Sequence, residues 1–494
     1  MTSRFHPSLS SGNISAGKLD HVILSEAKNL NQVKRLNKEI LRLALPSILA
    51  NLTVPLVGLV DIAVAGHLDS SAAALIGGIS VGSLMFDMMY WNFGFLRAGT
   101  GGLTAQAYGR EDWEACLALL KKGLGAAIIS ALFLILIQWP FQKLMFLFVH
   151  SSDEVRTLAL KYFHIRIWAA PATLSLMTLR GWFIGMQDTF SSMLTDIMVN
   201  GMNIVASILL ALGIPGSSFS GIGFSGIAWG TFIAQYSGLL TAAIIFSLKY
   251  RRLARRGSAS DSTLASSTHA TLGTVRGREF FSVNGDLFVR SLCLMVVYLA
   301  FTAISARFGD TLLAMCSIMM KLMMIFSYFT DGFAFAGEAL TGRFVGRRDK
   351  PALVQTVKWT FIWSMGIGLF FVAIYAAAGT PMFRLMTSDH TVIQAAKAYL
   401  PWLVIMPLLG CPAFTWDGIY IGATATKDMR DANIGCLIAF FIIWFGGILI
   451  SRATGSQLSL DAKVHLLFAA YYSHLIYRSV YQTLKYKTAI LGRA

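Results

Sequence analysis

The chain contains the stretch Leu103-Thr104-Ala105-Gln106-Ala107-Tyr108-Gly109-Arg110-Glu111-Asp112 and, further on, its near copy Leu340-Thr341-Gly342-Arg343-Phe344-Val345-Gly346-Arg347-Arg348-Asp349. The second copy starts 237 residues after the first (340 − 103 = 237). Gly181-Trp182-Phe183-Ile184-Gly185 and Gly418-Ile419-Tyr420-Ile421-Gly422 are separated by the same distance (418 − 181 = 237). One offset shared by two distant segments indicates a duplicated half. Two like halves around a shared axis, with the substrate site between them, are a common plan of secondary transporters.

The composition is that of an integral membrane protein. Of the 494 residues, 55% are hydrophobic and only 13% are charged, too few polar groups to cover a soluble chain of this size. A helix needs ~20 residues to cross the hydrocarbon core, and division at charged, Gly and Pro breaks gives about six spans per half. The alternation of barrel strands is absent. We expect an all-α integral membrane protein with about twelve transmembrane helices, in two six-helix lobes related by internal pseudo-two-fold symmetry. Clear apolar stretches are 123–139, 204–212, 359–378 and 436–450.

The formal net charge of +16 is spread over alternate loops instead of one soluble face. This positive-inside distribution predicts that both termini lie in the cytoplasm, and it disfavours a nucleic-acid partner. The amino-terminal residues 1–38 are polar and contain no apolar core of a cleavable signal peptide. The basic clusters are Arg110, Lys121 and Lys122; Lys249, Arg251, Arg252, Arg255 and Arg256; Arg343, Arg347, Arg348 and Lys350; and Lys485 with Lys487.

A segment rich in Ser, Thr, Gly and Ala, residues 257–274, separates the two halves and is expected to be a flexible cytoplasmic linker. We predict a cytoplasmic amino-terminal tail, an N-lobe of six helices, the linker, a C-lobe of six helices and a cytoplasmic carboxy-terminal tail. Their predicted bounds are 1–38, 39–249, 250–277, 278–486 and 487–494.

Asp61 is the first ionisable residue inside a predicted span, in Val57-Gly58-Leu59-Val60-Asp61-Ile62-Ala63-Val64. Charged residues are costly to insert in a membrane and mark ion or substrate pathways. Apolar neighbours favour the neutral carboxyl, which suits reversible protonation. The alternative is a structural carboxylate that caps a broken helix.

A second polar set consists of Asp196, Asn200 and Asn203, whose spacings of four and three residues place them on one helical face. With Asp61 they are our candidates for proton or cation coupling, through amide hydrogen bonds to the carboxyl. The alternative for this stripe is hydrogen bonding between packed helices. Asp87, in the next span, is expected to pair with a basic partner.

In the second half, the coupling candidates are Arg290, Asp331, Glu338 and Asp417. Asp331 and Glu338 are seven residues apart, so two helical turns return them to one face. Asp286 and Arg290 are four apart and are expected to neutralise each other. For each of these residues the alternative is a structural buried ion pair.

The cavity between the lobes is expected to be lined by aromatic and Met side chains, because flexible, polarizable surfaces accept many shapes and aromatic faces attract cations. The alternative for each residue is ordinary helix packing. The candidates are Met88, Met89, Trp91, Met320, Met324 and Tyr328.

Enzyme motifs are missing from the sequence. It has no phosphate-binding loop ending in Lys-Ser or Lys-Thr and no His-Glu-x-x-His. The five cysteines lack metal or disulfide spacing and are expected to be apolar packing residues. We therefore predict a protein that is not an enzyme, binds no metal and has no cofactor.

Five strings, in order, carry a resemblance to a known family. They are Leu59-Val60-Asp61-Ile62-Ala63-Val64-Ala65-Gly66-His67-Leu68-Asp69; Gly94-Phe95-Leu96-Arg97 followed by Gly102-Leu103-Thr104-Ala105-Gln106-Ala107-Tyr108-Gly109; Gly181-Trp182-Phe183-Ile184-Gly185-Met186-Gln187; Asp331-Gly332-Phe333-Ala334-Phe335-Ala336-Gly337-Glu338-Ala339; and Asp417-Gly418-Ile419-Tyr420-Ile421-Gly422-Ala423-Thr424. From about residue 39 to about residue 486 the chain resembles the multidrug and toxic compound extrusion (MATE) transporters, in their DinF-like branch.

The resemblance implies two six-helix lobes that alternate between inward-open and outward-open shapes and export lipophilic, often cationic compounds in exchange for H⁺ or Na⁺. It implies that Asp61 is the proton site. The family string Asn-Ile-Val-Leu-Asp reads Asn203-Ile204-Val205-Ala206-Ser207 here, so serine replaces an aspartate. Either Asp196 substitutes for that aspartate in part, or Asp61 works with fewer charged neighbours.

We expect a proton-coupled multidrug antiporter, with H⁺ or Na⁺ as coupling ion, a small lipophilic or cationic substrate and a monomeric, multi-pass form in the bacterial inner membrane. The alternative is a flippase for lipids or polyprenyl-linked oligosaccharides, which relatives of this fold transport. A flippase predicts a more cationic central cavity. A membrane transferase is disfavoured, because the acids are scattered and do not pair at one membrane face.

Overall fold

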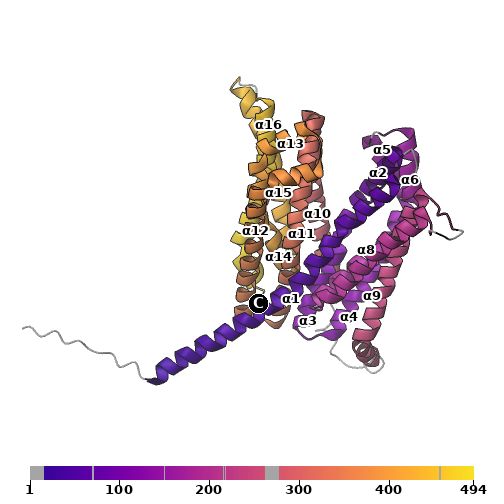
Figure 1. Cartoon of the computed structure of the whole chain (residues 1–494). Coiled ribbons are helices and arrows are strands. Elements are labelled where there is room, and N and C mark those ends of the chain that lie inside the picture. The colour runs from indigo at the N-terminus through magenta and orange to yellow at the C-terminus, as the bar shows by residue number, and fades with distance from the viewer. Residues whose placement is uncertain are drawn as a thin grey trace, which may run out of the picture.

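The structure is a computed structural model that describes residues 16–68, 72–149, 151–214, 216, 219–261, 277–455 and 458–493. Within these ranges every regular element is helical (Figure 1). Residues 262–276, most of the predicted linker, lie outside the described ranges, as do residues 1–15 of the predicted tail. The domain bounds therefore stay predictions.

Most helices of the first half are long. Two pairs of consecutive helices follow each other directly, with only a short break between them. The 3₁₀ turns Asn92–Gly94 and Ile167–Ala169 join α2 to α3 and α6 to α7. The helices are α1 (Ala16–Gly66), α2 (Ala72–Trp91), α3 (Phe95–Gly109), α4 (Trp113–Leu136), α5 (Gln138–Phe148), α6 (Asp153–Arg166), α7 (Ala170–Gly185), α8 (Thr189–Leu212) and α9 (Phe224–Asp261).

The second half has seven helices among the described residues. A 3₁₀ turn, Ala306–Phe308, precedes α11, and a π-helical turn, Lys487–Leu491, follows α16. The helices are α10 (Gly277–Ser305), α11 (Asp310–Arg347), α12 (Lys350–Met386), α13 (His390–Ala398), α14 (Leu400–Gly422), α15 (Thr426–Ala453) and α16 (Leu460–Tyr486).

Among the described residues, ten helices or continuous helix pairs are long and apolar enough to cross a membrane. The interrupted pair α6 and α7 packs against α2, α3 and α4, and the more polar α16 packs against α14 and α15. These two elements complete six transmembrane elements in each half. The predicted all-α membrane fold in two lobes is confirmed.

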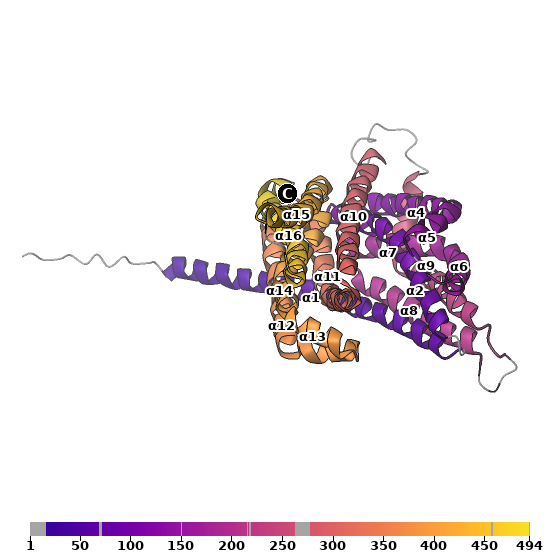
Figure 2. The same cartoon turned by 90° about the horizontal axis from the view of Figure 1, so that it is seen from above.

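The two lobes are separate groups of helices that meet at one end of the molecule. In Figure 1 the helices of the first half and those of the second approach each other where α3 lies. They diverge toward the opposite end, where α5, α6 and α13 lie. The view from above also separates α10 to α16 from α2 to α9 (Figure 2).

The first helix belongs to both lobes. Its earlier part contacts the C-lobe: Asn37 Oδ1 accepts a hydrogen bond from Trp363 (2.7 Å), and Glu39 pairs with Arg343 (3.1 Å). Its later part contacts the N-lobe, where Thr53 accepts a hydrogen bond from Asn200 (2.5 Å). Pro46 and Pro55 lie inside α1, and each removes a backbone donor and weakens the helix locally. α1 therefore runs from one lobe to the other (Figure 1), and its prolines mark the segment where it can bend.

The duplication recurs in the backbone at the same offset of 237. Glu111 and Arg348 both have positive φ, at 61° and 57°, and so do Gln187 and Thr424, at 62° and 50°. The two following helices are capped alike, since Asp112 accepts a hydrogen bond from the Ala115 N–H and Asp349 from the Ala352 N–H. The repeated sequence thus encodes the same two turns twice, which confirms the duplicated half.

Glycines of the two copies make the contact between the lobes. A Cβ on Gly109 would lie 2.1 Å from the carbonyl oxygen of Arg343, and a Cβ on Gly346 would lie 2.2 Å from that of Gln106. The two contacts are equivalent under the offset, because 109 + 237 = 346 and 106 + 237 = 343. Helices α3 and α11 therefore meet backbone to backbone around the pseudo-two-fold axis, as small residues allow in membranes.

The turn before α8 is tied to α9 by a charged anchor. Asp188 caps α8 and accepts hydrogen bonds from Lys249 (2.6 Å), Ser191 (2.6 Å) and Tyr250 (2.7 Å). Burial opposes ionisation of this carboxyl, but hydrogen bonds from Lys249, Ser191 and Tyr250 outweigh it and hold the pKa of Asp188 below its ordinary value.

Replacement of Asp188 by Asn should lower stability by about 2 kcal/mol at pH 7, because the Lys249 ammonium loses its buried partner. A depressed pKa stabilises the fold above the unfolded value of about 3.9 and ceases to do so as pH falls through the folded value. The difference in melting temperature between wild type and Asp188→Asn should therefore shrink at pH 3. Asp112→Asn is the matched control, because Asn caps a helix as well as Asp and no lysine bonds Asp112 among the described contacts. An equal loss in both variants would contradict the anchor.

Replacement of Gly346 by Ala should keep the lobes apart at their common end, because the new methyl group would lie 2.2 Å from the Gln106 oxygen. Spin labels at the exposed positions Lys121 and Lys350 should report a longer distance. Gly366→Ala is the control, since its Cβ meets nothing within 4 Å and both changes raise helix propensity equally. An unchanged distance in Gly346→Ala would exclude the backbone contact.

Candidate functional site

One buried ion pair joins the two lobes near the centre. Arg97 of α3 and Glu338 of α11 approach to 3.0 Å, and the Glu338 side chain is fully buried. The Arg97 guanidinium also lies 4.5 Å from the centre of the Phe335 ring, which adds a cation–π attraction. A charge at this depth needs such a partner, because desolvation is costly.

A second group of charges lies beside this pair, within the C-lobe. Asp417 of α14 pairs with Arg290 of α10 and lies 3.4 Å from Arg478 of α16. Arg478 is 1% exposed, and its guanidinium lies 5.5 Å from the Phe414 ring. The structure thus places Arg290 and Asp417, both predicted site residues, in direct contact.

Asp331 joins the same cluster. Its carboxyl interacts electrostatically with the charges of Arg97, Asp417, Arg290 and Arg478. With Glu338, the cluster contains three acids and three arginines, so its charges balance when all are ionised. The predicted second-half residues are therefore brought together.

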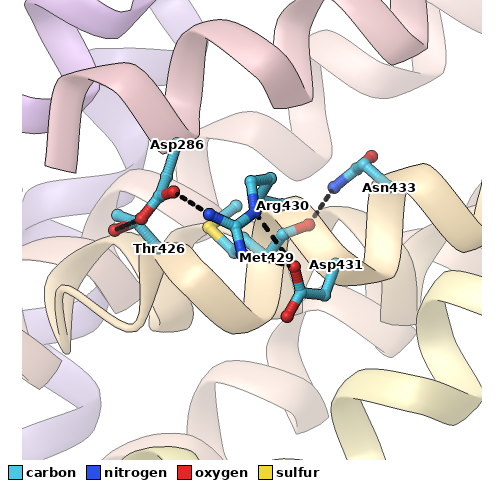
Figure 3. A network of polar contacts seen from close by, with 6 residues as sticks. All are labelled: Asp286, Thr426, Met429, Arg430, Asp431 and Asn433. Atoms are coloured by element: carbon cyan, nitrogen blue, oxygen red, sulfur yellow. Dashed lines mark hydrogen bonds and ion pairs between the residues drawn. The ribbon is translucent and has the colours of Figure 1, made fainter. Parts of the chain in front are cut away.

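The expected local pair between Asp286 and Arg290 is wrong. The Asp286 carboxylate accepts hydrogen bonds from Arg430 (2.8 Å) and from the Thr426 hydroxyl (3.1 Å) of α15, and Arg430 also bonds its neighbour Asp431 (Figure 3). Arg290 pairs with Asp417 instead. Each charge has a partner on a neighbouring helix, and that contact replaces the weak pair along one helix.

In the N-lobe, Asp61 is 5% exposed on α1, and among the described residues its Oδ1 has no hydrogen-bond partner. The groups that act on this carboxyl are the Arg166 guanidinium and the Ser207 hydroxyl. Ser207 stands where the family string has an aspartate, so the structure places that substitution at the Asp61 carboxyl. The Asp61 carboxyl is thus influenced by one cation and one neutral hydroxyl.

The sequence reasoning missed Arg166 and Arg478. The signal was present, since each is a lone arginine among aromatic and aliphatic residues, in Phe163-His164-Ile165-Arg166-Ile167-Trp168 and Leu475-Ile476-Tyr477-Arg478. Arg166 ends α6, directly before the break to α7. Its positive charge also acts on the carboxyl of Asp87 on α2, and so does that of Lys321 on α11.

The polar stripe on α8 does not converge on Asp61. Asp196 pairs with Arg180 of α7, Asn200 donates to Thr53 of α1 (2.5 Å), and Asn203 donates to Thr231 of α9 (2.9 Å). The three residues thus hold α8 to three different helices. The structure corrects the expected amide hydrogen bonds to Asp61, and of the two alternatives for the missing aspartate it supports fewer charged neighbours.

The predicted cavity residues divide into two groups. Trp91 is 41% exposed and stacks on Tyr298 of the other lobe at 6.1 Å, while Met88, Met324 and Tyr328 are half-buried. Met89 and Met320 are buried, at 4% and 6% exposed, and pack in the cores of the two lobes. Those two are core residues in this structure, because they lie on the inner faces of α2 and α11.

In the described part of the chain, no cluster of three or more His, Cys, Asp or Glu side chains is suited to hold a metal ion. All five cysteines are buried thiols, as expected of apolar packing residues. What the site offers is paired charges, a buried carboxyl at Asp61 outside the described ion pairs, and aromatic surface.

Comparison with known proteins gives one family. The MatE family profile matches residues 46–209 and 287–445. The chain is 34% identical to the DNA damage-inducible protein F of Escherichia coli (strain K12) over 396 residues, which cover 80% of this chain and 83% of that protein. It is 26% identical to the probable multidrug resistance protein NorM of Photorhabdus laumondii, with coverage of 80% and 84%.

Solved structures share the fold. A multidrug resistance MATE family transporter in an outward-facing conformation superposes with a TM-score of 0.76, at 16% identity, over 92% of this chain and 96% of that chain. The bent form of the Vibrio cholerae MATE transporter VcmN gives a TM-score of 0.73, at 16% identity, over 94% and 99%.

Replacement of Glu338 by Gln should destabilise the protein by roughly 3 kcal/mol, because the Arg97 charge keeps its desolvation cost and loses its partner. Replacement of both residues, as Arg97→Met with Glu338→Met, should cost less, since no unpaired charge is left. Melting temperatures in detergent measure both effects. A double variant at least as unstable as Glu338→Gln would show that packing, and not the ion pair, joins the lobes here.

Proposed function

The chain belongs to the MatE family, and we propose that it is a secondary active antiporter that exports lipophilic, often cationic compounds in exchange for H⁺ by alternating access. Its relatives include proteins named as multidrug resistance proteins, which supports export of small molecules. The choice of H⁺ as coupling ion rests on Asp61. This residue is buried in a membrane helix, and one of its carboxyl oxygens has no hydrogen-bond partner among the described residues.

The proposed coupling uses the electrostatics of that carboxyl. A proton neutralises Asp61 when the site faces the more acidic side, and its release restores the carboxylate beside Arg166. Antiport requires that proton and substrate disfavour each other by a coupling free energy of about 1 to 3 kcal/mol. A neutral Asp61 attracts a cationic substrate less than a charged one, which supplies this opposition.

The conformational part of the proposal rests on α1. Asp61 lies on the N-lobe part of α1, while Glu39 is bonded to Arg343 of the C-lobe. A change of charge at Asp61 therefore acts on the helix that links the lobes, and the prolines at 46 and 55 allow it to bend. Contact at the α3 end, with divergence at the other end (Figure 1), supports an outward-open state.

For the substrate, the proposal uses the aromatic surface between the lobes. Trp91 and Tyr298 come from opposite lobes and stack, so they separate or rotate when the lobes move. Met88, Met324 and Tyr328 are partly exposed near this level, and such side chains bind flat cations of varied shape. A flippase expects a more cationic centre, but three acids offset the three central arginines.

The protein acts in this proposal as a multi-pass monomer of the bacterial inner membrane, and both of its termini lie in the cytoplasm. The end where the lobes meet bears basic residues such as Arg110 and Arg347, and positive loops face the cytoplasm. This orientation makes the diverging end the outer one, which suits export.

The decisive experiment is export by proteoliposomes with an imposed pH gradient and a fluorescent cation as substrate. Asp61→Asn, which mimics the protonated carboxyl, should abolish gradient-driven export and bind the cation more weakly, while the protein stays folded and inserted. Asp310→Asn, at an exposed position at the start of α11, is the control and should export normally. Should Asp61→Asn export against a gradient at a near-normal rate, the coupling site would lie among Asp331, Glu338 and Asp417.

A further inference from the structure

The C-lobe contains a cavity of about 370 Å³ whose wall includes none of the proposed coupling residues. Three segments that are distant in the sequence form this wall: the first turns of α10, the turn into α15, and the chain after α16. Each segment contributes one basic side chain, and these are Arg278, Lys427 and Arg493. The carboxy-terminal end of the chain lies where the lobes meet (Figure 1). In the proposed orientation this is the cytoplasmic end, so the cavity lies at the inner face of the membrane.

Arg493 is held in place by the backbone and still offers a donor. Its Nε donates a hydrogen bond to the Ala489 carbonyl (2.9 Å), and its Nη1 donates one to the Thr424 carbonyl (3.3 Å). Nη2 takes part in neither bond, so one edge of the guanidinium stays available to an acceptor. Arg278 and Lys427 are exposed. The three side chains together provide the donors that bind phosphate oxygens by charge-assisted hydrogen bonds.

The wall also contains two acids, but they do not cancel the three basic charges. Both oxygens of the Asp286 carboxylate are occupied, one by Arg430 (2.8 Å) and the other by the Thr426 hydroxyl (3.1 Å). Figure 3 shows this carboxylate turned toward the two α15 residues. Arg430, which is not part of the wall, therefore balances Asp286. Glu279 is exposed and offsets one basic side chain, so the wall keeps an excess of positive charge.

The internal repeat shows what the cavity lacks. Asp188 caps α8 in the N-lobe, and its equivalent under the offset is Ala425, at the start of α15 (188 + 237 = 425). Asp188 accepts a hydrogen bond from the Ser191 N–H (3.3 Å) and pairs with Lys249 (2.6 Å). Ala425 has no side-chain acceptor, so the first N–H groups of α15 receive no such bond from it. The N-lobe thus places a carboxylate between a helix start and a basic side chain, where the C-lobe has a basic cavity.

We propose that this cavity is a binding site for a phosphate group, which takes the place in the C-lobe that the Asp188 carboxylate has in the N-lobe. Phosphate oxygens accept hydrogen bonds from basic side chains and from N–H groups at a helix start. Lys427 and Arg493 hold the phosphate, and Arg278 adds its charge from the α10 side. The site is separate from the proposed transport, because none of its residues is a coupling or substrate residue.

The phosphate group can belong to a lipid or to a soluble compound. Ser282 is part of the wall, and its neighbour Phe281 is 70% exposed. A lipid would cover this apolar surface with its acyl chains, and basic pockets on the cytoplasmic side of membrane proteins bind anionic headgroups. A soluble phosphate uses the same basic side chains and needs no apolar surface.

A phosphate bound here also acts on the contact between the lobes. The Thr424 hydroxyl accepts a hydrogen bond from Gln106 of the N-lobe (3.0 Å), while the Thr424 carbonyl accepts one from Arg493 (3.3 Å). A ligand that fixes Arg493 therefore stabilises the turn to which Gln106 is bonded. The site thus strengthens the closed end of the molecule.

The test measures the melting temperature of the full chain in a non-ionic detergent, because a ligand that binds the folded state raises it. One arm titrates inorganic phosphate against chloride at equal ionic strength, and the other titrates short-chain phosphatidylglycerol against phosphatidylcholine. Wild type should show a saturable rise. A rise with phosphatidylglycerol alone identifies a lipid headgroup, and a rise with inorganic phosphate shows that the phosphate group is sufficient. No saturable rise in either arm overturns the proposal.

Two variants and a control place the effect at the cavity. Lys427→Gln should increase the concentration needed for half of the rise at least about tenfold, because one charge-assisted hydrogen bond is lost. Ala425→Asp supplies the carboxylate that the N-lobe has and should abolish the response. Lys350→Gln is the matched control, since Lys350 is an exposed lysine at the start of α12, but Asp349 caps that helix. It should respond as wild type does.

The result does not depend on how well Ala425→Asp folds. Lys427 is exposed, so its replacement leaves the core intact, and an unchanged half-point in Lys427→Gln would overturn the proposal. The measurement needs no ion gradient and is independent of export. Phosphate binding by a protein that exports nothing would refute the proposed antiport and keep this site, and normal export without phosphate binding would do the reverse.

Discussion

The close approach of α3 and α11 is the contact on which the arrangement of the two lobes depends. In a bilayer, helices gain little from apolar burial against one another, so small residues that let backbones touch decide where they meet. Gly109 and Gly346 provide such contacts twice, related by the internal symmetry. Gln106 then reaches across to the Gly422 carbonyl (3.1 Å) and the Thr424 hydroxyl (3.0 Å). The lobes are thus joined by backbone geometry at one end and are free to diverge at the other.

The same backbone framework carries different charges in its two halves. Arg180 and Asp417 are equivalent under the offset (180 + 237 = 417), and each is half of an ion pair, but with opposite sign. Duplication therefore supplied symmetric helix contacts, while the chemistry diverged. An asymmetric charge set suits a transporter in which one lobe holds the coupling ion.

The pairing of buried charges explains why so many ionisable residues are tolerated. When all are ionised, the charges of Arg97, Arg290 and Arg478 are balanced by those of Glu338, Asp417 and the neighbouring Asp331. Asp61 is different, because the ion pairs of the described residues do not include it. A carboxyl held near a cation, but not locked to it, can lose and regain a proton without breaking the structure.

Residue order alone determined the membrane class, the duplication and the place of Asp61 in an apolar helix, because hydropathy, repeat offset and helical spacing are properties of the linear chain. It did not determine which charges meet. Spacing rules compare residues on one helix, and so they paired Asp286 with Arg290 and grouped Asn203 with Asp196 and Asn200. In the folded chain, Asp286 pairs with Arg430 and Asn203 bonds Thr231. Only tertiary structure brought Arg97 to Glu338 and Arg478 to Asp417, because an ion pair depends on distances between helices that lie far apart in the sequence.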